Sequence, residues 1–247
     1  MDNKEIMLKK SNEIIDSALE HFKRYLELKD QILNNEYVQV FSELSKIAQF
    51  VKGTNHLIVN RKFQKFLEGF NENEEPLDNQ INKLVNYVTD EDKAEFIADT
   101  FTKVMLTNSS KASLIMGSIL HSVISTEGPL EHEKLVCINA LTTFFNNDLE
   151  NVKFIYEYMQ ENNRKRLYLP NLIRYCKEKN INNSSVVLTV EKCVSSQIMF
   201  REFETDISAS VDVDNESVDI DNNDVDEYHK FSRPGIILLT YINRTIK

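Results

Sequence analysis

The sequence predicts a mainly α-helical protein that ends in a small unit of helices around a β-hairpin. Glycine (5) and proline (4) are scarce among the 247 residues, a composition that favours helices over a β-sandwich. Apolar residues recur at helical spacing through most of the chain, and two β-prone runs stand near its end. We expect three regions: N-terminal helices over 1–70, a helical bundle over 71–163 and a C-terminal unit over 164–247.

Residues 4–34 form one long predicted helix with an apolar seam at a/d-like spacing. The seam must be covered, because exposed apolar surface costs about 25 cal/mol per Å². Two covers remain open: the rest of the same chain, or a second copy in a homodimer. The seam residues used for self-association would be Ile15, Phe22, Leu26 and Leu33.

The bundle repeats a pattern of polar cap, apolar stripe and stop, after a polar linker at 71–76. Caps are expected at Thr89–Asp90, Ser109–Ser110 and Asn147–Asp148. The helix after Ser109–Ser110 has few polar positions, so it is expected at the centre of the bundle. Pro129 should start the next helix. Its inward residues are predicted to be Leu135, Ile138, Leu141 and Phe145.

The C-terminal unit begins with a short amphipathic helix over 171–179, after Pro170. A capping signal at Asn183–Ser184 opens a second helix, whose apolar positions include Val187, Val190, Cys193 and Val194. Two predicted strands, 198–203 and 228–231, then bracket a long insert at 204–227, as in a hairpin. A closing helix is expected from Arg233 to Ile246, with its cap at Ser232.

Two phrases of this unit carry a resemblance to winged helix-turn-helix domains. The first, Leu188-Thr-Val-Glu-Lys-Cys-Val-Ser-Ser-Gln-Ile198, is similar to a recognition helix running into the wing. The second, Tyr228-His-Lys-Phe-Ser-Arg-Pro-Gly-Ile-Ile-Leu-Leu-Thr-Tyr-Ile242, is similar to the return strand, helix cap and last helix. The resemblance covers residues 165–247, about a third of the chain. It implies a C-terminal winged helix with an enlarged wing, and recognition of nucleic acid or protein rather than chemistry.

The net charge of −10 is concentrated in the insert. Residues 204–227 contain ten acidic residues and no basic one, so the rest of the chain balances 29 acidic against 29 basic residues. The sequence therefore predicts a neutral body with one negatively charged arm that could bind a protein partner. The ten acidic residues are Glu204, Asp206, Asp212, Asp214, Glu216, Asp219, Asp221, Asp224, Asp226 and Glu227.

The insert contains two similar heptads, 210–216 and 217–223, in which Val or Ile alternates with Asp. Three interpretations remain open: a disordered or fraying arm, an exposed ribbon that binds a partner, and a calcium site. The calcium-loop pattern lacks the glycine that makes its sharp turn.

Charge favours protein recognition over DNA binding. The expected exposed positions of the recognition helix sum to zero charge, and the acidic wing would repel phosphates. The alternative is a transcription regulator that binds DNA, with a basic group just before that helix. Its nucleic-acid contacts would be Arg164, Lys165, Arg166, Arg174, Ser184, Ser185, Thr189 and Lys192.

We expect no catalytic residues and no cofactor, because the chain has no HExxH, CxxC, G-x-S-x-G or P-loop motif. A third hypothesis is a divalent-metal-binding helical domain. His121 and His132 could converge with Glu127 and Glu131 if the turn between them folds back.

Cysteine usage and hydropathy indicate a cytoplasmic protein without a membrane partner. No apolar run approaches the roughly 18 to 20 residues of a membrane span, and the first residues do not lead into a signal-peptide core. Cys137, Cys176 and Cys193 stand among apolar residues at helical spacing, which is typical of buried thiols in a reducing compartment.

Two further resemblances concern the middle and the layout. Residues 114–145, with the acidic turn Ser125-Thr-Glu-Gly-Pro-Leu-Glu-His-Glu133, are similar to tellurite-resistance-type helical domains. The order of long helix, helical middle and terminal winged helix resembles uncharacterised bacterial proteins carried by prophages and defence loci. These resemblances imply a regulatory or interaction role, associated with phage or defence.

Overall fold

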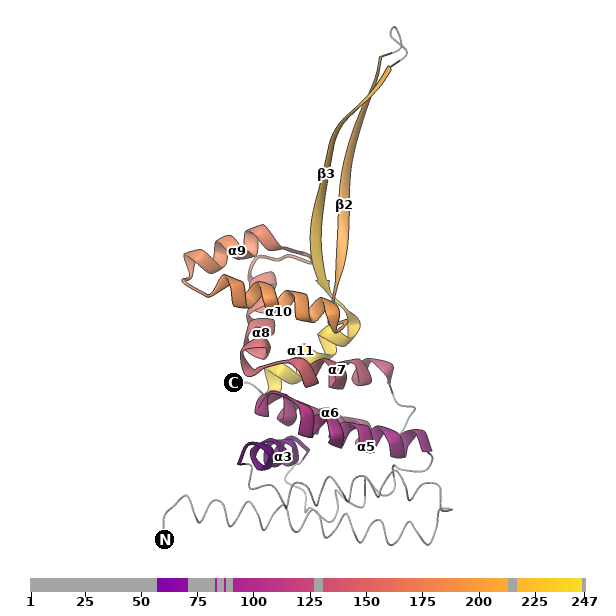
Figure 1. Cartoon of the computed structure of the whole chain (residues 1–247), viewed down its shortest axis with the longest axis vertical. Coiled ribbons are helices and arrows are strands. Elements are labelled where there is room, and N and C mark those ends of the chain that lie inside the picture. The colour runs from indigo at the N-terminus through magenta and orange to yellow at the C-terminus, as the bar shows by residue number, and fades with distance from the viewer. Residues whose placement is uncertain are drawn as a thin grey trace.

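The computed structural model describes residues 57–70, 83, 87, 91–126, 131–212 and 217–245. These residues are mainly helical, with a small three-stranded antiparallel sheet. The helices lie stacked along the long axis, and a β-hairpin projects from one end (Figure 1). The elements are α3 (Leu57–Phe70), α5 (Glu91–Leu106), α6 (Ser110–Ser125), α7 (His132–Thr143), α8 (Asn146–Glu161), β1 (Leu167–Tyr168), α9 (Leu169–Glu178), α10 (Asn183–Ser195), β2 (Met199–Asp212), β3 (Ser217–Phe231) and α11 (Arg233–Thr245).

Several expectations fall outside the described residues. The long helix predicted over 4–34, with Ile15, Phe22, Leu26 and Leu33, lies there, as does the linker at 71–76. The division at residue 163 stays a prediction. Among the described residues, a continuous apolar core runs from Phe66 on α3 to Ile242 on α11.

Helices α3 and α6 cross at backbone contact because each has a glycine at the crossing. A Cβ on Gly117 would lie 2.1 Å from the carbonyl oxygen of Phe66, and one on Gly69 would lie 1.9 Å from that of Leu114. The Ser118 hydroxyl donates to the Gly69 carbonyl at 3.3 Å. The two glycines therefore set the distance between these helices.

Helix α6 is central, as its sequence predicts. Its residues Ile115, Met116, Ile119 and Leu120 are fully buried. The predicted cap is also confirmed, since the Ser109 hydroxyl accepts a hydrogen bond from the backbone N–H of Ala112 at 3.0 Å.

The predicted inward face of α7 is right for Ile138 and Leu141 but wrong at its end. Phe145 is 52% exposed, whereas its neighbour Phe144 is fully buried. The helix ends at Thr143, so the helical spacing that pointed Phe145 inward no longer applies. Phe145 instead precedes α8, where its N–H donates to the Asp148 carboxylate at 2.8 Å.

Helices α8, α9 and α10 are each followed by a left-handed residue other than glycine. Asn163, Asn180 and Gln197 have φ of 50°, 55° and 63° and follow α8, α9 and α10. After α10 the N–H of Ile198 donates to the Cys193 carbonyl at 2.8 Å. The N–H of Gln197 donates to the Val194 carbonyl at 3.1 Å, which completes a Schellman motif.

The cap predicted at Ser232 is confirmed and ties α11 to the base of the hairpin. The Ser232 hydroxyl accepts from the N–H of Gly235 at 3.1 Å and lies 2.6 Å from the Gln197 carbonyl. A Cβ on Gly235 would lie 2.1 Å from the Ile198 carbonyl oxygen. The start of α11 therefore packs directly on the chain that enters β2.

The sheet has the order β1-β3-β2, with antiparallel pairing throughout. The strands predicted at 198–203 and 228–231 are far too short, because pairing continues from Met199 opposite Phe231 to Asp212 opposite Ser217. The acidic insert therefore forms most of a long hairpin. This result favours the ribbon among the three interpretations of the insert and contradicts a disordered arm over the paired residues.

Candidate functional site

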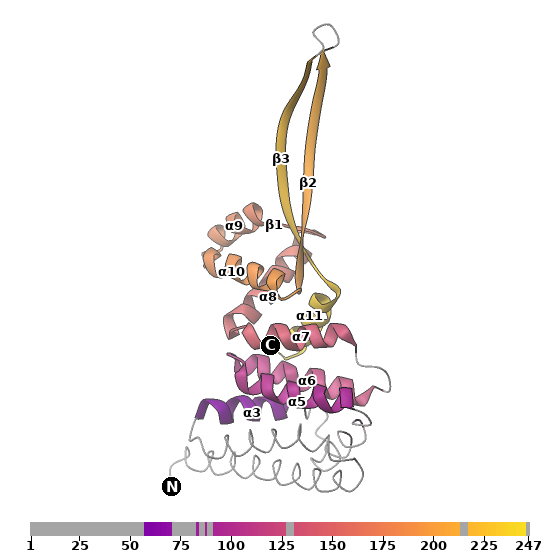
Figure 2. The same ribbon diagram turned by 45° about the vertical axis from the view of Figure 1, so that its right-hand side comes forward.

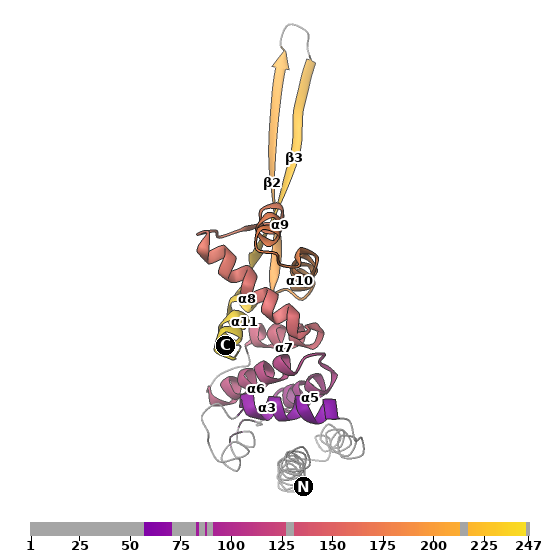
Figure 3. The ribbon, with the colours of Figure 1, turned by 90° about the vertical axis from the view of Figure 1, so that its left-hand side faces the viewer.

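The hairpin of β2 and β3 projects beyond the helices, and its base lies near α10 and β1. In three views the distal half of the hairpin stands apart from the labelled helices (Figure 1, Figure 2 and Figure 3). Eight of the ten acidic residues of 204–227 lie in the two described strands, Asp214 and Glu216 lie outside the described residues, and that range contains no Lys or Arg. The most acidic segment of the chain is therefore also its most protruding described element.

The register of the hairpin separates its residues onto two faces. Successive residues of a strand alternate between faces, and residues that lie opposite each other share one. By this alternation, one set of positions, here called the apolar face, has mostly uncharged residues in the sequence beyond the base, and the other set, the acidic face, has most of the Asp and Glu residues. The apolar face has the positions Phe203, Thr205, Ile207, Ala209 and Val211 on β2 and, opposite them, Glu227, Val225, Asn223, Ile220 and Val218 on β3, so its one acidic position is at the base. The acidic face has Glu202, Glu204, Asp206 and Asp212 on β2 and Asp226, Asp224, Asp221 and Asp219 on β3.

A β-bulge maintains this separation. Ile207 lies opposite Asn223, but Ser208 lies opposite Asp221, so Asn222 is an extra residue in β3. Val225 and Ile220 are an odd number of residues apart, and regular alternation would place them on opposite faces. The bulge adds one position and returns both to the apolar face.

Cations of the body neutralise the acidic residues at the base of the hairpin. Arg201 makes ion pairs with Glu191 of α10 and, at 2.9 Å, with Glu227. Arg166, just before β1, pairs with Glu204 at 3.1 Å and lies 4.4 Å from the ring centre of Tyr228. Beyond this level the hairpin sequence supplies no cation.

The buried His229 lies in the central strand at the same level, opposite Leu167 and Arg201. Neither of its ring nitrogens has a hydrogen-bond partner, although Nε2 lies 3.3 Å from a carboxylate oxygen of Glu227. Desolvation by burial lowers the pKa of His229, and this outweighs the opposite effect of the nearby carboxylates. The sheet therefore favours the neutral imidazole.

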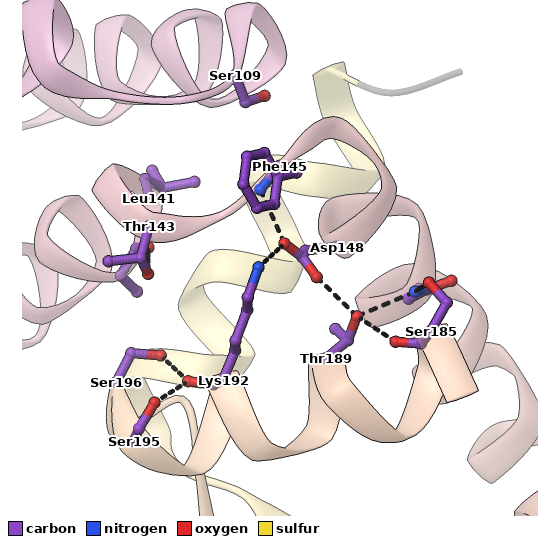
Figure 4. Close-up of polar contacts among 12 residues, drawn as sticks. Ser109, Leu141, Thr143, Phe145, Asp148, Ser185, Thr189, Lys192, Ser195 and Ser196 are labelled. Carbon is purple, nitrogen blue, oxygen red and sulfur yellow. Dashed lines mark hydrogen bonds and ion pairs between the residues drawn. The ribbon is translucent and has the colours of Figure 1, made fainter. Parts of the chain in front are cut away.

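Asp148 at the start of α8 fixes one side of α10 (Figure 4). Its carboxylate accepts from the Thr189 hydroxyl at 2.8 Å and from Lys192 Nζ at 2.6 Å. Lys192 Nζ also lies 4.3 Å from the ring centre of Phe145. The Thr189 hydroxyl accepts from the amide of Asn151 at 2.9 Å. This cluster joins α10 to α8 within the protein.

The cluster corrects two of the predicted nucleic-acid contacts on α10. Thr189 is completely buried, and Lys192 is half-buried with its ammonium bound to Asp148. Ser185 is also half-buried, near the amide of Asn151. Ser184 is exposed, as expected.

The exposed side of α10 has one apolar residue, polar residues and a carboxylate, but no Lys or Arg. It carries Ser184, Leu188, Glu191 and Ser195, at the spacing of one helix face. Leu188 is 64% exposed. Glu191 is paired with Arg201 of β2. Sequence periodicity could have found this face, because Ser184, Leu188, Glu191 and Ser195 follow the i, i+4, i+7, i+11 pattern.

The predicted basic residues outside α10 are exposed on other elements. Arg164, Lys165 and Arg174 lie in the turn after α8 and on α9. Arg166 is exposed as well, but it is committed to Glu204 at the hairpin base. These cations do not share a helix face with the exposed residues of α10.

The structure does not bring together the residues of the predicted metal site. His121 is buried on α6, 6.0 Å from the ring centre of Phe70, whereas His132 is an exposed first residue of α7. Glu127 lies outside the described residues, and Glu131 pairs with Lys134 at 3.2 Å. Among the described residues no group of three His, Cys, Asp or Glu side chains could hold a metal ion.

The prediction of buried thiols is confirmed for Cys137, Cys176 and Cys193, which are free and buried. Burial raises the pKa of Cys137 to about 12 and also raises that of Cys193. A thiol with a raised pKa is a poor nucleophile, because the thiolate is the reactive form.

No protein-family model, curated protein or solved structure matches this chain. Over the ranges that the structure describes, the helices are too short or too polar to cross a membrane.

Proposed function

We propose that the chain is a non-enzymatic protein-interaction or regulatory protein whose acidic hairpin binds a basic surface of a protein partner. The observation that carries the proposal is the hairpin itself, a projecting ribbon (Figure 1) whose register puts most of its Asp and Glu positions on one face. Opposite charge on a partner would steer association and make binding depend strongly on salt.

The order of elements supports a winged-helix platform beneath this hairpin. Helices α9 and α10 follow each other across a short turn, and the hairpin of β2 and β3 comes next, before α11. The small strand β1 pairs with β3 and completes the sheet. In this proposal α10 stands where the recognition helix of such domains stands, and the hairpin is an enlarged wing.

The exposed face of α10 supports a protein partner over a nucleic acid. Phosphate binding needs exposed Lys or Arg, but the exposed positions of α10 include Leu188 and Glu191. The one lysine of this helix is held by Asp148.

The test compares partners captured from lysate by the full chain and by a chain whose residues 206–224 are replaced with an Asn-Gly turn. The shortened chain should retain its helices by circular dichroism. We expect it to lose a set of basic proteins that the full chain retains at low salt and releases at high salt. Recovery of the same proteins by both chains would contradict the proposal.

The second candidate is a DNA-binding transcription regulator, which the exposed cations Arg164, Lys165 and Arg174 favour. These could contact phosphates from the α9 side of the unit. A gel shift with genomic fragments near 50 mM salt tests it, since phosphate contacts are strongest at low salt. Absence of a shift would count against this function and leave the protein-binding proposal standing.

A further inference from the structure

We propose that the free edge of β2 pairs with an extended segment of the partner in which cationic and apolar residues alternate. The inference rests on the proposed function and specifies the chemistry of the basic partner. It follows from three properties of the hairpin: an unpaired edge, two chemically different faces, and uncompensated negative charge.

Along the distal hairpin both edges are unpaired, because β1 pairs with β3 only at Tyr228 and His229; of the two, the edge of β2 has no strand beside it over its whole length among the described residues. In the described sheet, β3 lies in the middle and β2 at the border. The base of β2 lies near α10, to which Arg201 is linked through Glu191. From Phe203 to Asp212 the strand continues away from the helices (Figure 2). Such an edge offers a row of backbone donors and acceptors, and an added strand satisfies them.

The two faces specify the residues of the added strand. A strand beside β2 would alternate between the acidic face and the apolar face, because sheet faces are continuous across neighbouring strands. On the apolar face Phe203 is 62% and Val225 is 56% exposed. A partner residue on this side should be apolar, and its neighbours in sequence should be Lys or Arg.

Charge excludes a second copy of the chain as the preferred occupant. The register already places Glu204 opposite Asp226 and Asp206 opposite Asp224, and like charges at opposite positions destabilise a sheet. Arg166 offsets the first pair at the base. A second β2 would add further carboxylates to the same face, whereas a cationic strand would neutralise those present.

The test measures binding of synthetic peptides to the full chain by fluorescence anisotropy. The first probe alternates Lys and Val over about ten residues, the length of the edge from Phe203 to Asp212 at about 3.3 Å per residue. The matched control has the same composition in two blocks, all Lys and then all Val. We expect the alternating peptide to bind about tenfold more tightly.

Two N-methylated versions of the alternating peptide test backbone pairing. In one the Val nitrogens are methylated, and in the other the Lys nitrogens. Only one set of N–H groups faces the edge in an added strand, so one version should lose binding and the other should retain it. Equal binding by both versions would overturn edge pairing.

The outcomes separate this inference from the proposed function. Equal, salt-dependent binding of the alternating and block peptides would overturn strand addition and leave recognition of basic surfaces intact. Absence of salt-dependent binding for both would overturn the inference and the proposed function together.

Substitutions in the protein test where the peptide binds. Replacing Phe203 and Val225 with Ser should weaken binding of the alternating peptide severalfold. Replacing the remote Leu106, which is 69% exposed on α5, with Ser is the matched control and should have no effect. Equal weakening by both changes, or by neither, would contradict a site on the hairpin.

Discussion

His229 is the residue whose titration should be visible in the stability of the fold. Burial lowers its pKa, so the unfolded chain binds the proton more readily than the folded one. Its contribution to stability is present above the unfolded pKa, near 6.5. That contribution is lost as pH falls from there toward the lowered folded pKa.

We therefore expect His229→Gln to reduce the loss of unfolding free energy between pH 7 and pH 5. Urea titrations at both pH values measure this, and each unit of pKa difference corresponds to about 1.4 kcal/mol. The exposed His132→Gln is the control and should leave the pH dependence unchanged. The groups that face His229 are Glu227, Glu191 and Arg201, and all remain in both variants. Identical pH profiles for the two variants would contradict the assignment.

Replacing Gln197 with glycine should stabilise the fold. Its φ of 63° lies in the left-handed region, which costs a residue with a Cβ about 1–2 kcal/mol. Gln197→Gly is expected to raise the unfolding free energy by up to about 1 kcal/mol, because the entropic cost of glycine offsets some of the gain. The same change at Gln160, inside α8, should lower it by about 1 kcal/mol. Thermal unfolding of both variants should show shifts of opposite sign.

At the scale of elements, Gly117 decides how closely α3 and α6 approach. Gly117→Ala would place a methyl group 2.1 Å from the Phe66 carbonyl oxygen, and backbone cannot yield as a flexible side chain does. We expect a loss of about 3 kcal/mol, at the upper end of overpacking costs. Ser118→Ala, one residue away, removes one hydroxyl shared between the Gly69 and Leu114 carbonyls and should cost about 1 kcal/mol. Similar values for the two variants in urea unfolding would refute a backbone-limited crossing.

Asp148 should contribute more to the free energy of unfolding than a surface carboxylate on the same helix. Asp148→Ala would leave Lys192 and the Phe145 N–H without their acceptor and would remove one of the two acceptors of the buried Thr189 hydroxyl, the other being the Ser185 carbonyl. A cost of about 3 kcal/mol is expected for breaking such a partly buried cluster. The exposed Glu150, paired with Lys111, should cost less than about 1 kcal/mol when changed to Ala. Chemical denaturation of both variants checks the contrast.

Local signals in the sequence predicted the caps at Ser109 and Ser232 but placed those of α8 and α10 too late in the chain, since their N-caps are Phe145 and Asn182. Nonlocal packing decided which faces are buried. Ser109 and Ser232 cap helices as expected, because a cap depends on residues three positions away. Thr189 was expected at the surface, but its face of α10 packs on α8 through Asp148, 41 positions earlier in the chain. Periodicity cannot identify a partner that distant.

The length of the hairpin could not be predicted for a related reason. Asp, Asn and Ser are depleted in strands, so the insert reads as a loop by composition. Its order comes from pairing of two acidic segments, in a register that the bulge at Asn222 adjusts. The repeated heptads indicate the alternation of apolar and acidic residues. They do not indicate the extra residue that puts Ile220 and Val225 on the same face.

At the scale of the whole molecule, charges of opposite sign lie on different elements of residues 164–247. The hairpin carries the net negative charge, and α9 with the preceding turn carries exposed cations. If the hairpin binds a protein, removing its negative charge should abolish binding. If the cations bind DNA, removing the positive charge of α9 should do so instead.

The most direct test captures partners with two neutralised variants side by side. One changes Asp206, Asp212, Asp219, Asp221 and Asp224 to Asn, and the other changes Arg174, Lys177 and Lys179 to Gln. Each removes charge without shortening the chain, and circular dichroism verifies the fold. The lysate is first treated with nuclease to remove nucleic acid. The retained proteins are then measured by quantitative mass spectrometry. We expect the hairpin variant to lose its protein partners and the α9 variant to retain them. Loss of partners from the α9 variant alone would contradict recognition by the acidic hairpin.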